Sequence, residues 1–225
     1  METEVKLSFK DKDQLYAVAS ADFFRKLCVD SSEPEKVLLE NTYLDTPDLS
    51  ISKRSGAIRV RHYKSSSLDK YEFTVKYGGG AAAGLHRRFE WNVDSVDGNF
   101  SIEEFKTKAN ANNDPADLLN EAFGTIKDED LVVVCSNSFY RTVYKLLFEN
   151  STIEACFDSG LIKSSDGSQS DEICELELEL IDGDVNSLNI LSAVLISKTG
   201  CSPLNDTKYR RTLACAKIGI NGNEK

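Results

Sequence analysis

Strict two-residue alternation of apolar and ionic side chains recurs along this chain, and it constrains the fold more than any other feature. In CELELEL, residues 174–180, three glutamates alternate with leucine. In AIRVRHY, residues 57–63, two arginines alternate with isoleucine and valine. Because successive side chains of a β-strand point to opposite faces, each segment predicts a strand with one ionic and one apolar face.

The same pattern continues in ETEVKLSF at residues 2–9, YEFTVKY at 71–77 and RRFEWNV at 87–93. Two less regular segments place Arg141 and Asp158 where they can join the ionic set. For a single strand, the simplest interpretation is a face that is exposed to water. The chain as a whole disfavours that interpretation, because one strand carries only bases among its charged residues and another carries only acids.

A closed barrel would explain why acidic and basic residues are segregated on different strands. If the apolar faces point outward under helices, the acidic and basic rows converge in the interior. Crowding like charges there costs several kcal/mol per buried ion unless something neutralises them. A hard divalent cation would neutralise the acidic residues, and a chain of phosphates would neutralise the basic ones.

Composition excludes several other classes of function. The net charge of −10 disfavours general nucleic-acid binding, although a basic pocket can still hold a small polyanion. Only two histidines occur, which disfavours serine or cysteine triads, and the six scattered cysteines form no CxxC pair. We expect reduced thiols, carboxylate metal ligands and a cytoplasmic protein without membrane association, since no apolar run approaches the roughly 20 residues of a membrane span.

Three helices are predicted from apolar spacing: one from Asp13 to Leu27 with Asp13 as the cap, one at 113–123, and one that starts at Asp184 and ends at Gly200. In the second helix, Asp114 is the expected cap and Pro115 the first helical residue. Flexible hairpin loops are predicted at 64–69, 78–84 and 164–171. We expect one domain over residues 1–217 and a flexible tail over 218–225.

Several ordered motifs extend over nearly the whole chain: ETEVK at 2–6, NTYLDTPD at 41–48, RVR at 59–61, GLHRRFEWNV at 84–93, ICELELEL at 173–180 and TKYRR at 207–211. Together they resemble the CYTH domains, the triphosphate tunnel metalloenzymes, and most closely the inorganic triphosphatase branch. The late motif departs from the SKxxRGY of that branch, since Lys208 and Arg211 keep their spacing while the serine and the Gly-Tyr end are replaced.

The resemblance implies an α+β fold, a closed antiparallel eight-stranded β-barrel with helices packed outside. It implies Mg²⁺ or Mn²⁺ as the cofactor, held by carboxylates among Glu2, Glu4, Asp158, Glu175, Glu177 and Glu179. It implies that the substrate phosphates are held by Lys6, Arg59, Arg61, Lys76, Arg88, Arg141, Lys208 and Arg211. Catalytic roles fall to Glu4, Lys6, Glu90 and Asp158, with water attacking a terminal phosphoryl group in line. Glu72 and Glu154 share strand faces with these residues, but surface pairing explains them equally well.

The resemblance leaves the activity open within one fold. The leading expectation is hydrolysis of inorganic triphosphate (tripolyphosphate) by a monomer or homodimer. The alternatives are a thiamine triphosphatase, which predicts an aromatic platform near one mouth of the tunnel, and a nucleoside triphosphatase, an RNA triphosphatase or an adenylate cyclase. A polyphosphate-binding module without turnover is the alternative from another class.

Overall fold

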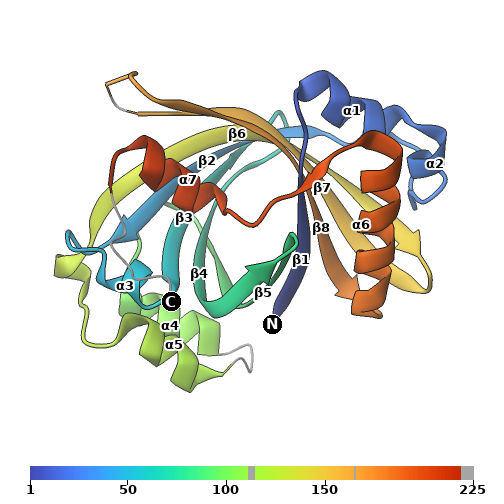
Figure 1. Cartoon of the computed structure of the whole chain (residues 1–225). Helices are drawn as coiled ribbons and strands as arrows, with labels where there is room; N and C mark the ends of the chain where they lie inside the picture. The colour runs from blue at the N-terminus through green and yellow to red at the C-terminus, as the bar shows by residue number, and fades with distance from the viewer. Residues whose placement is uncertain (111–114, 165, 219–225) are drawn as a thin grey trace.

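Eight antiparallel strands close into a barrel in the computed structural model, which describes residues 1–110, 115–164 and 166–218 (Figure 1). The strand order is β5-β4-β3-β2-β6-β7-β8-β1, and pairing of β1 with β5 completes the cylinder. The strands are β1 Glu2–Ser8, β2 Lys36–Asp45, β3 Gly56–Lys64, β4 Asp69–Ala82, β5 Leu85–Ser95, β6 Val132–Phe148, β7 Ser151–Lys163 and β8 Ser170–Asp182, with a two-residue β9, Ser202–Pro203, beside β1. The closed eight-stranded barrel predicted from the sequence is confirmed.

Helices lie around this cylinder, outside the sheet or at its end (Figure 1). They are α1 Lys12–Ser20, α2 Asp22–Arg25, α3 Ser50–Lys53, α4 Ile102–Asn110, α5 Ala116–Phe123, α6 Val185–Thr199 and α7 Lys208–Cys215, with a 3-10 turn at Asp128–Asp130. No helix among the residues that the structure describes combines the length and the apolar character needed to span a membrane.

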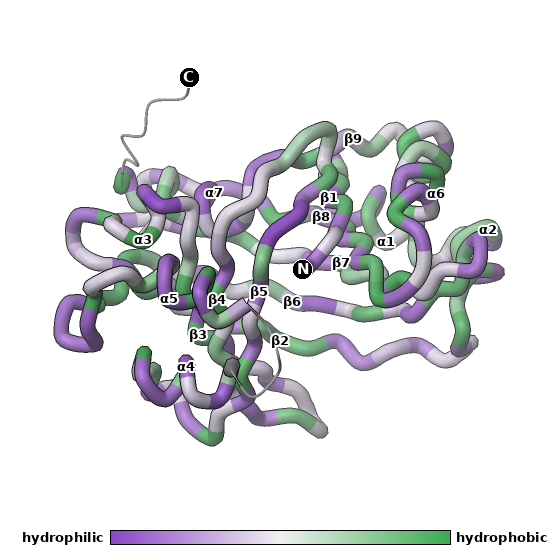
Figure 2. The backbone as a smooth tube through the Cα atoms, turned by 90° about the horizontal axis from the view of Figure 1, so that it is seen from below, coloured by the Kyte–Doolittle hydropathy of each residue, from purple (hydrophilic) through white to green (hydrophobic). Residues whose placement is uncertain are grey.

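The strand register turns the ionic rows toward the barrel interior. Lys6 of β1 lies opposite Glu177 of β8, and Lys76 of β4 lies opposite Glu90 of β5. Cross-strand partners share one face of a sheet, so the acid and the base of each of these two pairs point to the same side. Hydrophilic and hydrophobic residues both occur along the strands, as the colours in Figure 2 show.

The outward faces of the strands form two separate hydrophobic cores under the helices. Helices α1, α2 and α6 cover β1 and β6–β8, where Leu15, Phe24 and Leu188 are fully buried. Helices α4 and α5 cover β3–β5, where Trp91 packs with Phe105. Burial of each such side chain contributes about 1.5–3 kcal/mol, so these cores hold the barrel wall from outside and leave its interior free for polar residues.

Helix α7 packs against the inner face of the barrel at one end. The strand residues that it covers are apolar, and the two clusters consist of Leu39, Phe139, Ile162, Ile173 and Cys215, and of Tyr43, Cys135, Tyr209 and Leu213. The interior therefore has two parts. One end is apolar and filled by α7, and the remainder is ionic.

The predicted helices are only partly correct. The helix at 184–200 is confirmed as α6, with Asp184 as its N-cap and Gly200 as its C-cap at a φ of 71°. The single helix expected from Asp13 to Leu27 is wrong, because the chain breaks at Ala21 into α1 and α2. The cap is Asp11, whose carboxylate accepts a hydrogen bond from the Gln14 backbone N–H at 2.8 Å.

Other local predictions also need correction. Pro115 is the N-cap of α5 and not its first helical residue, and the expected cap, Asp114, lies outside the described residues. The glycine-rich segment at 78–84 is not wholly a loop, because β4 continues through it to Ala82 with a bulge after Tyr77. The loops at 64–69 and 164–171 do connect paired strands. Of the predicted tail, only Ile218 lies within the described residues.

Candidate active site

One cavity of about 360 Å³ occupies the ionic part of the barrel interior. Twelve of the residues singled out from the sequence line it: Glu2, Glu4, Lys6, Arg59, Arg61, Lys76, Arg88, Glu90, Arg141, Glu177, Glu179 and Lys208. The other three do not line it: Asp158 and Glu175 contact Lys208, which does, and Arg211 pairs with Glu175. Closure of the sheet thus brings together side chains from six of the eight strands and from α7.

Carboxyl groups crowd together in the cavity on β1, β8 and β7, which are neighbours in that order. Burial, together with nearby carboxylates, raises the pKa of Glu2 to about 8 and that of Glu179 to about 7. Glu179 and Glu154 line the cavity, and neither has a cationic partner within 4 Å among the described residues. Carboxylate oxygens around such uncompensated charge are the donor set that Mg²⁺ and Mn²⁺ prefer, so the residues present fit a hard divalent cation.

Lys6 bridges two of the predicted metal ligands. Its ammonium lies 2.8 Å from Glu4 Oε2 and also pairs with Glu177. Burial alone would raise the pKa of Glu4, but the adjacent Lys6 ammonium outweighs it and holds that pKa below its ordinary value. Glu4 is therefore ionised at neutral pH without a metal, whereas Glu2 and Glu179, with their raised pKa values, would release protons when a metal binds.

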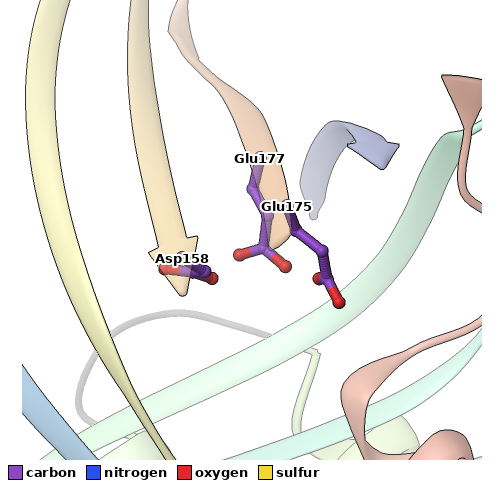
Figure 3. Close-up of side chains that lie close together, drawn as sticks. All are labelled: Asp158, Glu175 and Glu177. Carbon is purple, nitrogen blue, oxygen red and sulfur yellow. The ribbon is translucent and has the colours of Figure 1, made fainter. Parts of the chain in front are cut away.

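Asp158, Glu175 and Glu177 form the tightest group of carboxylates, with one oxygen of each within 4.8 Å of the others (Figure 3). Cations already surround this triad. Lys208 Nζ lies 2.8 Å from Asp158 Oδ2, 2.5 Å from Glu175 Oε2 and 2.8 Å from Glu177 Oε1. Arg141 forms a two-pronged contact with Asp158, at 2.7 and 2.6 Å.

Arg211 forms a further ion pair with Glu175. Burial alone would lower the pKa values of Lys208 and Arg141, but the surrounding carboxylates raise both above their ordinary values. The charge of the triad is therefore neutralised by the protein itself. Of the two acidic groups, the one that contains Glu154 and Glu179 has fewer cations within 4 Å among the described residues.

The opposite wall of the cavity is basic. Lys76 lies between Glu2 and Glu90, with contacts of 2.7 and 2.6 Å. Arg61 Nε donates to Asn41 Oδ1 at 2.7 Å. Arg59 donates through Nη2 to Thr74, whereas its buried Nε has no hydrogen-bond partner among the described residues. A buried guanidinium N–H without a partner is costly, and a phosphate oxygen in the cavity would satisfy it.

Arg88, at the edge of this wall, is oriented by His86. One Arg88 nitrogen lies 3.2 Å from His86 Nδ1, and His86 Nε2 lies 2.9 Å from the Leu204 carbonyl oxygen. Burial lowers the pKa of His86, which favours the neutral ring that accepts at Nδ1 and donates at Nε2. His86 is thus a buried residue that supports the Arg88 side chain.

Several cavity residues were not assigned from the sequence. Glu72 and Glu154 line the cavity. Their positions in the two-residue alternation already placed them on the same strand faces as the assigned residues. Tyr43, Tyr63 and Tyr209 also line it, although Tyr43 and Tyr209 stack on each other with ring centroids 4.7 Å apart. Nothing in the alternation indicates Tyr209, because it lies on α7 and not on a strand.

Comparisons with known proteins agree with the family and the barrel fold. A family model described as the CYTH domain matches residues 1–210. The inorganic triphosphatase of Haemophilus influenzae is 30% identical over 156 residues, which cover 69% of this chain and 40% of that protein.

Solved structures are similar in fold. A Hippeastrum protein, whose structure is described as revealing a dominant triphosphatase activity, matches with a TM-score of 0.64 and 15% identity over 95% of this chain and 96% of that one. A Bacillus halodurans protein matches with a TM-score of 0.53 and 18% identity over 94% and 96% of the two chains.

Proposed function

The chain belongs to the CYTH domain family, and from that premise we propose that it hydrolyses inorganic triphosphate to diphosphate and phosphate with the help of a divalent metal ion. The observation that carries the proposal is the cavity itself. A basic wall with an unpartnered guanidinium N–H faces a group of carboxylates with uncompensated charge, within about 360 Å³. Such a space suits a short, highly charged anion bound together with a cation.

In this proposal the basic residues hold the substrate. Arg59 and Arg61 of β3 and Lys76 of β4 receive phosphate oxygens from one side, and Lys6, Arg141 and Lys208 receive them from the other. Fixed cations around the phosphoryl group supply electrostatic stabilisation for charge that develops in the transition state, which is the main requirement of phosphoryl transfer.

The carboxylates have two roles in the proposal. Glu2, Glu4 and Glu179 would hold the divalent cation, and Glu177 would be free to join them if Lys6 turned toward the substrate. When bound there, the cation would polarise phosphoryl oxygens and lower the pKa of a nearby water. Glu90, whose pKa lies well below its ordinary value because Lys76 and Arg59 outweigh the effect of burial, accepts hydrogen bonds and orients water at neutral pH.

Phosphate release from tripolyphosphate tests the proposal, measured with Mg²⁺, with Mn²⁺ and without added metal. We expect metal-dependent release by the wild type and its loss in Glu4→Gln, which removes one ligand charge. Glu40→Gln is the matched control, since Glu40 pairs with Lys64 outside the cavity and is half-exposed. Cleavage of an organic triphosphate with no release from tripolyphosphate would overturn the choice of substrate, and undiminished activity of Glu4→Gln would overturn the metal assignment.

No observation favours the organic triphosphates over tripolyphosphate. A thiamine or nucleoside group calls for an aromatic face that is open to the cavity. The rings of Tyr43 and Tyr209 cover each other, and Tyr63 packs against the cations of Arg61 and Lys70. A polyphosphate-binding module without turnover remains distinguishable, since it would bind tripolyphosphate and release no phosphate.

A further inference from the structure

Tyr209 ties the first turn of α7 to β2 and α3. Its ring stacks on Tyr43 of β2, with centroids 4.7 Å apart and planes 28° apart. Its hydroxyl oxygen lies 2.6 Å from Ser52 Oγ of α3 and 3.4 Å from Asp45 Oδ2 at the end of β2. A residue that lines the cavity therefore has its polar end directed away from the cavity, toward a rigid turn.

Asp45 sets the direction of this hydrogen-bond chain. Its fully buried carboxylate accepts from the backbone N–H groups of Ile51 at 2.9 Å and Ser52 at 3.0 Å, and from Ser52 Oγ at 2.6 Å. The Ser52 hydroxyl donates its one proton to Asp45 Oδ2, so the Tyr209 hydroxyl must donate to Ser52 Oγ. Burial raises the pKa of Tyr209, so this phenol keeps its proton and remains a donor.

Lys208, the residue before Tyr209, carries the cation that α7 places in the cavity. Its ammonium contacts Asp158, Glu175 and Glu177 at 2.5–2.8 Å. Farther along the helix, Thr212 Oγ1 accepts a hydrogen bond from Asn137 at 2.8 Å and donates one to the Lys208 carbonyl oxygen at 2.6 Å. Lys208, the first residue of α7, is thus followed by two attachments, one that Tyr209 provides in the first turn and one that Thr212 provides in the second.

We propose that Tyr209 is a positioning residue, which acts through Ser52 and Asp45 to hold the first turn of α7 where the Lys208 ammonium meets the substrate phosphates. The hydroxyl does not touch substrate, because it is committed to Ser52. This inference rests on the proposed function for its kinetic consequence, whereas its structural consequence can be measured without turnover.

Tyr209→Phe is the direct test, because it removes the hydroxyl and keeps the ring stacked on Tyr43. One net hydrogen bond corresponds to about a 3- to 10-fold change in an equilibrium. We expect amide hydrogen exchange in residues 208–215 to rise by about that factor, and the KM for tripolyphosphate to rise likewise with kcat nearly unchanged. Ser52→Ala should reproduce both effects, and the double variant should be no worse than either single one, since all three break the same chain.

Tyr16→Phe is the matched control. Tyr16 donates to or accepts from Ser159 at 2.8 Å on the outside of the barrel, so this variant loses a similar Tyr–Ser hydrogen bond away from α7. It should leave exchange in α7 and the KM unchanged. Unaltered exchange in α7 of Tyr209→Phe, or an equal rise in KM in both tyrosine variants, would overturn the proposal.

A failure of the proposed function can be told apart from a failure of the positioning role of Tyr209. If the wild type releases no phosphate from tripolyphosphate, the function is refuted, and the positioning role is then decided by the exchange measurement together with calorimetric binding of tripolyphosphate. Weaker binding and faster exchange in Tyr209→Phe alone would still support it. Equal binding and equal exchange would refute it.

Discussion

Replacing Lys208 with methionine should destabilise the protein strongly, because its ammonium neutralises three buried carboxylates at once. The carboxylates of Asp158, Glu175 and Glu177 lie 2.5–2.8 Å from the ammonium, and their side chains are 0%, 2% and 11% exposed. Removing one member of a buried ion pair typically costs about 3–5 kcal/mol, because a buried charge is left uncompensated.

The lower end of that range is expected for Lys208→Met. Arg141 still pairs with two of the three carboxylates, and the methionine side chain keeps most of the apolar packing of the lysine stem. We therefore predict a loss of about 3 kcal/mol in the free energy of unfolding. Added Mg²⁺ should recover part of it, since the freed carboxylate triad gains affinity for a cation in the folded state only.

Urea unfolding followed by the fluorescence of Trp91, the sole tryptophan and a buried residue, measures this loss. Lys64→Met is the matched control: it breaks a contact of 2.7 Å with Glu40 in which both side chains are more than 40% exposed. Such surface pairs contribute about 0–1 kcal/mol. A loss in Lys208→Met no larger than that of the control would refute the reasoning that α7 neutralises a buried acidic group.

Two further predictions concern pH and packing. Because the folded-state pKa of Glu179 is raised from 4.5 to about 7, the folded protein binds more protons than the unfolded chain in that window, and stability without metal should fall as pH rises from about 4.5 to about 7. Glu179→Gln should flatten that part of the curve in urea titrations at pH 5, 6 and 7, and an identical slope in both proteins would contradict the assignment. Gly160→Ala should lower the free energy of unfolding by about 1–3 kcal/mol, since a Cβ there would stand 2.6 Å from the Cβ of Phe139. Unchanged urea unfolding would contradict this prediction and show that β6 and β7 can move apart at little cost.

Side-chain direction was predictable from the sequence because the pleat of a strand makes it a local property. Arg59 and Lys76 point inward and Val60 and Val75 outward, as their alternation indicates. The partners of each strand were not predictable from periodicity, because the pairing of β1 with β5 joins segments about eighty residues apart. The family motifs supplied the closed barrel that periodicity alone could not.

The apolar character of the interior at the α7 end could not be predicted from strand alternation. Leu39 and Phe139 lie on the inner faces of their strands, where the ionic pattern gives way to an apolar one, and only the position of α7 explains the change. Residues 207–211 were interpreted as a substrate motif and not as the start of a helix. The spacing of Tyr209 and Leu213, four residues apart, was a signal for a helical apolar face.

The pairing of acids with bases was also beyond the sequence. Charge patterns assigned carboxylates to a metal and cations to phosphate, as separate groups. In the structure Lys6 bridges Glu4 and Glu177, so each group neutralises the other. The register of β1 on β8 creates that contact, and register depends on the whole barrel.

The location of a bound metal and anion tests the central claim most directly. Crystals grown with Mn²⁺ and a non-hydrolysable tripolyphosphate analogue would show the metal by its anomalous diffraction. We predict a manganese peak inside the barrel, coordinated by carboxylates among Glu2, Glu4 and Glu179, with the analogue against Arg59 and Arg61. Manganese and analogue bound only on the outer surface, with the cavity residues still paired among themselves, would contradict the account.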